Sequence, residues 1–320
     1  MTIKPDVQVT GPVAQTIIDE ALPGEFVRSV SKLHGGAIAA IYEIALTSNR
    51  APVILKVYPQ LLHWKMRKEA NMLALVQDRL RVPTPRVLAV DDTKRHLKLN
   101  YLLVTKLEGT LLGSMEKTLG AEQYLTAYRQ IGGVLRDIHG IPMPAFGSIG
   151  ADGIMTPHVS NRAYLTTQFE RKLEEYTRRG GDGSHARSIA AIASSYAHLL
   201  DHCMAAVLCH NDLHASNVLA EVAADGTVEL SGVLDLENAQ AADPLMDLAK
   251  AAYYLGPSER RALIQGYGDT GRPQVGLTLR YYHLYFALVL WCWMAEIGDT
   301  AALPGLTRDL QRATHVDSDL

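Results

Sequence analysis

The hydrophobic pattern of this chain changes near Gly109, and that change limits the folds that the chain can form. Up to this residue, short runs of β-branched and other apolar residues alternate with Gly, Pro, Asn and Asp, which is typical of strands joined by turns. Residues 61–80 form a longer run without Gly or Pro and are predicted to be a helix. The predicted strands are residues 26–33, 38–46, 53–58, 87–90 and 99–107. We therefore expect an antiparallel sheet with one helix in the first part of the chain.

After Gly109 the pattern becomes mainly helical. The predicted helices are residues 121–139, 164–178, 186–204 and 244–254, with several more between 257 and 312. Short apolar strands interrupt them at residues 207–209, 218–221 and 228–234. With 320 residues, the chain is long enough for two units of ordinary domain size. We predict an α+β protein of two lobes, an N-terminal sheet lobe over residues 1–108 and a mainly helical C-terminal lobe over residues 109–320.

The composition excludes several classes of protein. Hydrophobic residues make up 48% of the chain and charged residues 20%, which is typical of a globular protein and not of a disordered one. No apolar run approaches the length of a transmembrane helix, and residues 1–13 lack the hydrophobic segment of a signal peptide. The three cysteines lack the spacing of a metal site, and their odd number does not indicate a disulfide framework. We therefore expect a cytoplasmic protein that does not bind membranes.

The charges are distributed unevenly between the two predicted lobes. Residues 1–108 contain 15 Lys and Arg against 10 Asp and Glu, a net charge of +5, whereas residues 109–320 contain 16 against 24, a net charge of −8. The total of −3 is too small to indicate binding of nucleic acid. Carboxylates that line a cleft attract cationic ligands, so the second lobe favours a cationic partner. Catalytic carboxylates and the acidic C-terminal tail account for part of the same excess.

Two charged residues of the first lobe lie in apolar surroundings. Glu69 shares a face of the predicted helix with Met66 and Leu73, and Lys56 is the one charged residue in the strand-like run 53–57. A buried charge requires a partner, so the two side chains are candidates for an ion pair. A purely structural salt bridge, or a lysine that extends toward water, explains the same residues.

The segment 210–217, HNDLHASN, is the densest group of polar residues that follows an apolar run. Within it, Asp212 and Asn217 are five residues apart, and Asp235 directly follows the third short strand. Polar side chains at strand ends are a common arrangement in active sites. A zinc hydrolase is disfavoured because His210 and His214 lack the helical HExxH pattern.

This segment resembles the catalytic loop of the protein-kinase-like fold, in the form found in the aminoglycoside phosphotransferase and choline kinase superfamily. The resemblance extends from about residue 31 to residue 250, with the motifs in the expected order. The residues that it assigns to nucleotide binding are Gly35, Gly36, Lys56, Glu69, Thr105 and Leu107. It assigns the catalytic role to Asp212, which would orient the acceptor hydroxyl and take its proton, and Mg²⁺ binding to Asn217 and Asp235.

Two features depart from the family pattern. Asn211 replaces the usual Gly of the catalytic loop, and Asn tolerates left-handed backbone angles better than most residues. The nucleotide loop, residues 34–40, lacks the polar Ser-Asn that is often found there, so its phosphate contacts would come from backbone amides. A nucleotide-binding module without catalysis is therefore an alternative to an enzyme.

The resemblance implies an ATP- or GTP-dependent O-phosphotransferase that uses Mg²⁺. A protein kinase is disfavoured because only a short segment separates Asp235 from Asp243 and no Ala-Pro-Glu follows. The expected acceptor is a small hydroxylated molecule, and the negative second lobe favours a cationic, aminoglycoside-like antibiotic. Choline, homoserine, a sugar, a macrolide and a peptide antibiotic fit the same motifs, because a fold alone does not fix a substrate.

Overall fold

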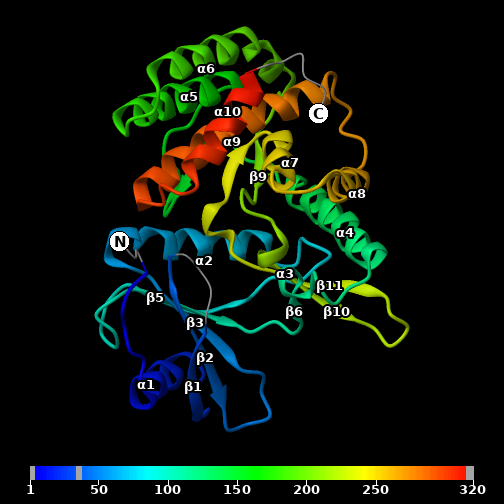
Figure 1. Cartoon of the computed structure of the whole chain (residues 1–320). Helices are drawn as coiled ribbons and strands as arrows, with labels where there is room; N and C mark the ends of the chain where they lie inside the picture. The colour runs from blue at the N-terminus through cyan, green and yellow to red at the C-terminus, as the bar shows by residue number, and fades with distance from the viewer. Residues whose placement is uncertain (1–3, 34–37, 315–320) are drawn as a thin grey trace.

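The computed structural model describes residues 4–33 and 38–314 and consists of two lobes stacked on one another (Figure 1). The first lobe contains a five-stranded sheet in the order β1-β2-β3-β5-β4, with every neighbouring pair antiparallel. Its strands are β1 (Val27–Leu33), β2 (Ala40–Leu46), β3 (Val53–Val57), β4 (Val87–Asp91) and β5 (Tyr101–Thr105). The predicted antiparallel sheet is confirmed, together with all five of its strands.

Two helices lie on opposite sides of this sheet. Helix α1 (Gly11–Ala21), which the sequence pattern did not predict, packs against β1. Helix α2 (Trp64–Val76) follows the short turn η1 (Gln60–Leu62) and lies along the boundary between the lobes (Figure 1). Helix α2 is shorter than the predicted 61–80, because η1 precedes it and because Gln77, with a ψ of 125°, and Asp78, with a φ of 59°, leave the helical conformation. The chain leaves the helix there and turns back toward β4.

The second lobe is mainly helical, as predicted. Its helices are α3 (Leu112–Met115), α4 (Ala121–His139), α5 (Asn161–Arg178), α6 (Gly183–Ser195), α7 (Pro244–Ala252), α8 (Pro257–Tyr267), α9 (Val275–Ile297) and α10 (Leu303–Thr314). The prediction of a single helix over 186–204 is wrong. Helix α6 ends at Ser195, and the separate 3₁₀ helix η2 (Ala197–His202) follows it. None of the helices in the described residues combines the length and the apolar character that crossing a membrane requires.

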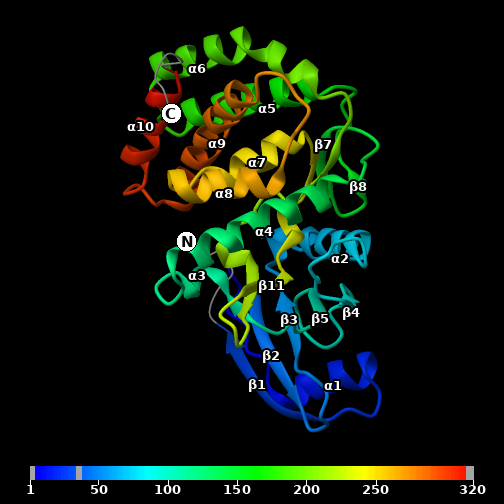
Figure 2. The same ribbon diagram turned by 90° about the vertical axis from the view of Figure 1, so that its right-hand side faces the viewer.

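Two small sheets between the helices carry the polar loops. One has the order β11-β10-β6, from β6 (Thr110–Leu111), β10 (Val218–Val222) and β11 (Val228–Val233). The other has the order β8-β7-β12-β9, from β7 (Gly147–Gly150), β8 (Gly153–Ile154), β9 (Val207–Cys209) and β12 (Gln240–Ala242). In the side view of Figure 2, β11 lies beside α3, between α4 and the sheet of the first lobe. The ends of β9 and β11 therefore face the boundary where α2 lies.

The hydrophobic core is shared between the lobes. Met66 and Leu73 of α2 belong to the same buried cluster as Leu135 of α4 and Leu245 of α7. A second, smaller cluster fills the space between α1 and the outer face of the sheet, and includes Leu55 of β3. Because side chains alternate along a strand, the neighbouring Lys56 points to the opposite face, toward α2. This alternation brings a lysine to the boundary between the lobes.

Candidate active site

Lys56 and Glu69 form the predicted pair at the boundary between the lobes. The Nζ atom of Lys56 lies 2.6 and 2.7 Å from the two carboxylate oxygens of Glu69, and their side chains are 12% and 3% exposed. The hydroxyl of Tyr58, which follows Lys56 by two residues and lies on the same face, also donates a hydrogen bond to Glu69. Burial alone would lower the pKa of Lys56, but the carboxylates of Asp235 and Glu69 outweigh it and raise this pKa. Lys56 therefore carries its positive charge in the folded protein.

The loop after β9 is held in place by a carboxylate from helix α7. The backbone N–H groups of His210 and Asn211 donate to the two oxygens of Asp247, at 2.6 and 2.8 Å. Asp247 also contacts Nε2 of His139 at 3.2 Å. Asn211 has a φ of 59°, which is the left-handed conformation that the sequence predicted this Asn to tolerate in place of Gly. These bonds set the direction in which the next residue, Asp212, projects.

The carboxylate of Asp212 is positioned by side chains from two other elements. Nδ2 of Asn238, in the turn η4 (Leu236–Asn238), donates to Oδ2 of Asp212 at 3.0 Å. Nζ of Lys250, on α7, lies 3.7 Å from Oδ1 and also donates to the backbone oxygen of Asn211. The Asp212 side chain remains 28% exposed. One carboxylate oxygen is thus fixed by an amide, while the group as a whole stays accessible to a substrate.

Asn217 and Asp235 lie next to each other across the loop. Nδ2 of Asn217 donates to the backbone oxygen of Asp212 at 2.9 Å, which leaves Oδ1 of Asn217 available as a ligand. The backbone N–H of Leu234 donates to the backbone oxygen of Asn217 at 2.9 Å, so the two segments are joined directly before Asp235. Asp235 has a φ of 66°, a strained conformation for a residue with a side chain, and such strain is concentrated at functional sites.

The donor atoms at this point suit a hard divalent cation. Carboxylate oxygens of Glu69, Asp235 and Glu237 lie within 4.8 Å of one another, and Oδ1 of Asn217 adds an amide oxygen on the adjoining segment. Mg²⁺ binds oxygen ligands of this kind and retains several waters. Oδ1 of Asp235 is also 3.4 Å from Nζ of Lys56, so the group that could hold a metal adjoins the lysine that could hold phosphates. Burial would raise the pKa of Asp235, but the charges of Lys56 and His210 lower it. This carboxylate is therefore ionised at neutral pH.

The hinge residues Thr105 and Leu107 occupy the segment between the lobes. The backbone N–H of Thr105 donates to the backbone oxygen of Arg86 at 2.9 Å, and the Thr105 hydroxyl accepts from the N–H of Arg86. The backbone N–H of Leu107 has no acceptor among residues 4–33 and 38–314. Of these N–H groups, that of Leu107 is the one that could bind an adenine edge. The predicted phosphate-loop glycines Gly35 and Gly36 lie outside the described residues.

Sequence reasoning missed the residues that support Asp212 and Glu69 from a distance. These are Tyr58, Lys65, Asn238 and Lys250. Lys65 of α2 donates to Oδ1 of Asn238 at 2.8 Å and to Glu237 at 3.2 Å, which links the first lobe to the catalytic loop. Only Tyr58 had a usable signal, because it follows Lys56 by two residues and so shares its face of the strand.

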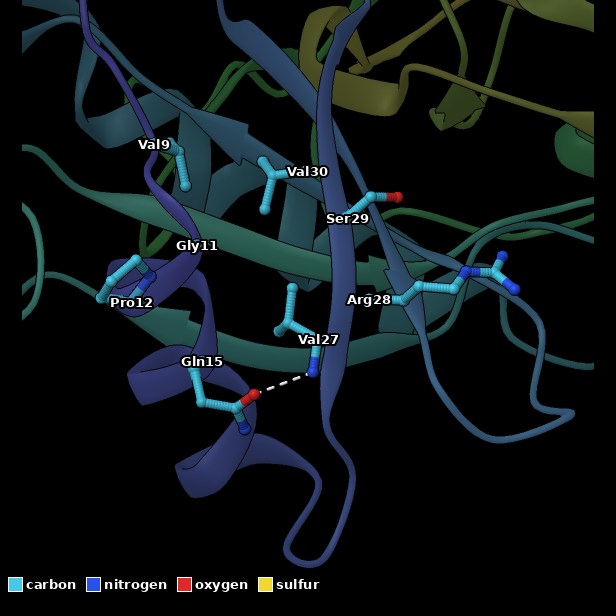
Figure 3. A pocket seen from close by; sticks show the side chains of 8 residues that line it. All are labelled: Val9, Gly11, Pro12, Gln15, Val27, Arg28, Ser29 and Val30. Atoms are coloured by element: carbon cyan, nitrogen blue, oxygen red, sulfur yellow. Dashed lines mark hydrogen bonds between the residues drawn. The ribbon is translucent and has the colours of Figure 1, made fainter.

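Two cavities lie away from Asp212, Asn217 and Asp235. One, of about 390 Å³, is bounded by α1 and the edge strand β1 (Figure 3), where Oε1 of Gln15 accepts from the N–H of Val27 at 2.8 Å. The other, of about 240 Å³, is lined by the end of α2, residues 77–86 and the hinge residues Thr105 and Leu107. Neither cavity contains Asp212, Asn217 or Asp235 in its lining.

The chain resembles known phosphotransferases in sequence and in fold. A sequence profile of the phosphotransferase enzyme family matches residues 29–277. No curated protein sequence matches the chain significantly. A solved structure of a thermostable mutant of aminoglycoside phosphotransferase APH(4)-Ia, with ADP and hygromycin B, has a TM-score of 0.73 at 16% identity, covering 96% of this chain and 99% of that one. An aminoglycoside phosphotransferase of the APH(2") type, with GDP and kanamycin, has a TM-score of 0.69 at 14% identity, covering 95% and 99%. The predicted two-lobed, protein-kinase-like fold is confirmed.

Proposed function

Because the chain belongs to the phosphotransferase enzyme family, we propose that it is a kinase that transfers the γ-phosphate of ATP or GTP to a hydroxyl group of a small molecule. One observation carries this proposal. Asn217 is hydrogen-bonded to the backbone of Asp212 and of Leu234, the residue before Asp235, and Oδ1 of Asp235 lies 3.4 Å from Nζ of Lys56, which is paired with Glu69. A base, metal ligands and a phosphate-binding cation are thus adjacent, as phosphoryl transfer requires.

Each side chain has a role that follows from its surroundings. Lys56, held by Glu69, binds the α- and β-phosphates. Asn217 and Asp235 hold Mg²⁺, which when bound neutralises charge on the phosphate oxygens. The backbone N–H of Leu107, which lies beside Thr105 and has no acceptor among the described residues, meets the adenine edge, and the resemblance implies that Gly35 and Gly36 offer backbone amides to the phosphates.

The transfer itself is a displacement at phosphorus. The acceptor oxygen forms a bond to the γ-phosphorus while the bond from that phosphorus to the bridging β–γ oxygen breaks, which releases the nucleoside diphosphate. Asp212 orients the hydroxyl and takes its proton. Oδ2 of Asp212 accepts from Asn238 at 3.0 Å, whereas Oδ1 has only the longer contacts of 3.7 Å to Lys250 and 3.9 Å to His214, so Oδ1 is the atom that would face the hydroxyl.

The acceptor is the open part of this proposal. An aminoglycoside-like cation is one candidate, favoured by the net charge of −8 over residues 109–320 and by the hygromycin B and kanamycin bound to the structurally similar enzymes. Part of that negative charge is used inside the protein, because Asp235 and Glu237 face Lys56 and Lys65 of the first lobe. Choline, homoserine, sugars, macrolides and peptide antibiotics are the other candidates.

The proposal is tested by measuring nucleotide consumption with Mg²⁺ across a panel of these acceptors. We expect one class of acceptor to stimulate turnover, and Asp212→Ala to lower kcat by about 10²- to 10⁴-fold, the usual contribution of a positioned base. Asp299→Ala removes an exposed carboxylate outside the site and is the matched control. Nucleotide binding without turnover of any acceptor would instead support the non-catalytic module.

A further inference from the structure

Lys68 is a buried cation that has no hydrogen bond or ion pair within residues 4–33 and 38–314. The residue is only 5% exposed. The ring of Trp64, whose centroid is 5.9 Å from the Lys68 ammonium, and the carboxylate of Glu237 stabilise its charge. An aromatic ring compensates only part of the cost of taking an ammonium out of water. A buried ammonium in this state is suited to bind an anion that comes from outside the protein.

Lys68 shares one face of helix α2 with Lys65, the lysine that leads to the proposed base, Asp212. Lys65 and Lys68 are three residues apart on α2 and so lie on one face of the helix, which packs against η4. Lys65 reaches Asp212 through Asn238, with hydrogen bonds of 2.8 and 3.0 Å. Lys250 approaches Asp212 from α7, at 3.7 Å. Two ammonium groups, those of Lys65 and Lys250, therefore lie near Asp212, and Lys68 is the neighbour of Lys65 on the same helix face. Of these three lysines only Lys68 has no polar partner among the described residues.

The charges that act on Lys68 agree with this geometry. The pKa of Lys68 is lowered to about 7, and burial is the largest cause. The positive charges of Lys65 and Lys250 lower this pKa as well, whereas the negative charge of Glu237 raises it. An anion beside Lys68 would stabilise the charged form.

We propose that Lys68, with Lys65 and Lys250 beside it, binds an oxyanion of the acceptor molecule, a carboxylate or a phosphate group. This inference rests on the proposed kinase function and specifies its acceptor. The oxyanion belongs to the acceptor and not to the nucleotide, because Lys56 is the lysine that adjoins Asp235, whereas Lys65 and Lys250 contact or lead to Asp212. A polycation that carries only ammonium groups would be repelled from this face.

The first test uses a simple anion and does not require the acceptor to be known. With the nucleotide site filled by AMP-PNP and Mg²⁺, inorganic phosphate is titrated against the full chain and the melting temperature is followed. We expect phosphate to raise the melting temperature of the wild type and of Lys68→Arg, and to leave that of Lys68→Met unchanged. Lys98→Met, which removes an exposed lysine, is the matched control. An equal response of wild type and Lys68→Met would overturn the proposal.

The second test identifies the acceptor class by turnover. Pairs of hydroxylated compounds in which a carboxylate replaces a hydroxymethyl group are compared, namely glucose with glucuronate and glycerol with glycerate, and kanamycin serves as a polycation. We expect the anionic member to have a kcat/KM at least about tenfold higher, the effect of one charge-assisted hydrogen bond. Lys68→Met removes this preference by raising KM for the acceptor, while KM for ATP changes less than about twofold, since Lys68 does not contact the nucleotide.

The outcomes separate this inference from the kinase proposal. Turnover of neutral or cationic acceptors that Lys68→Met does not alter would leave the kinase intact and contradict the oxyanion site. A rise in KM for ATP alone would assign Lys68 to the nucleotide and also contradict it. Phosphate binding that depends on Lys68, without turnover of any acceptor, would support the site and count against the kinase. If Lys68→Met does not fold, Lys68→Gln, which also removes the charge, takes its place in the first test, and an equal response of wild type and Lys68→Gln would overturn the proposal.

Discussion

Asp212 depends for its orientation on residues that are far from it in sequence. Asn238, which donates to Oδ2 of Asp212, is itself bonded through Oδ1 to Lys65 of α2. A side chain of the first lobe therefore supports the proposed base of the second lobe through one amide. This arrangement makes Asn238 a positioning residue, since it acts on the substrate only through Asp212.

We predict that Asn238→Ala lowers kcat by about 10- to 100-fold, because a hydrogen bond to a charged group contributes roughly 1.5–3 kcal/mol. The KM for ATP should change little, since Lys56 and Glu69 are bonded to each other and not to Asn238. Steady-state kinetics with the acceptor found by the panel measures both constants. Asn49→Ala, at an exposed turn, is the control, and a loss confined to KM for ATP would contradict the positioning role.

The sequence predicted the polar residues with a direct chemical role in the candidate site, and it did not predict the residues that only hold them in position. Asp212, Asn217 and Asp235 stand out because polar side chains directly follow apolar strands, and the structure brings these three residues together. Lys65 and Asn238 are 173 residues apart, and no local pattern links them. Their contact arises only from the way α2 packs on η4, which is a property of the whole fold.

At the scale of elements, prediction succeeded where periodicity extends over several turns. Helix α4 begins and ends at the predicted residues, Ala121 and His139. The strands β6, β7, β8 and β12 have two to four residues each and were not predicted, because each contains Gly, Thr or Gln, whereas the equally short β9 is apolar throughout. They are stabilised by neighbouring strands of the small sheets, which come from distant parts of the sequence.

Close packing of α4 against α8 leads to a prediction for one glycine. A Cβ atom added at Gly266 would lie 1.8 Å from the backbone oxygen of Arg129, so the two helices would have to separate. We predict that Gly266→Ala destabilises the protein by about 1–3 kcal/mol or more, as overpacking does. Gly276→Ala is the matched control, because an added Cβ there meets nothing within 4 Å and Ala favours a helix by about 0.4–1 kcal/mol. Urea unfolding of both variants measures the difference, and equal effects would contradict the packing argument.

At the scale of the molecule, the opposite charges of the two lobes serve in part to hold them together. Lys56 and Lys65 of the first lobe face Asp235 and Glu237 of the second, at 3.4 and 3.2 Å. Arg81 contacts Asp137 of α4 at 2.5 Å. In each of these pairs the cation belongs to residues 1–108 and the carboxylate to residues 109–320, so the net charge of −8 is a weaker sign of a cationic acceptor than it is when read from the sequence alone.

The burial of Lys68 should make the unfolding free energy of the whole molecule depend on pH. The pKa of Lys68 is lowered from 10.5 to about 7, with burial as the main cause, so between these values the unfolded chain binds more protons than the folded one. Stability therefore rises as the pH increases through this window, and the penalty is fully present below pH 7. We predict that the unfolding free energy of the wild type, relative to that of Lys68→Met, rises with pH between 7 and 9 by at most about 1.4 kcal/mol per pH unit.

Bound anion should remove this dependence, because an oxyanion beside Lys68 restores the ammonium and brings its pKa in the folded protein back toward the unfolded value. Denaturant unfolding at a series of pH values, with and without phosphate, measures both slopes. Lys250 and Lys65 are present in both proteins, so the comparison with Lys68→Met isolates the titration of Lys68 together with its coupling to these two lysines. A flat difference between wild type and variant in the absence of phosphate would mean that water reaches the Lys68 ammonium, and the case for an anion at this position would fall with it.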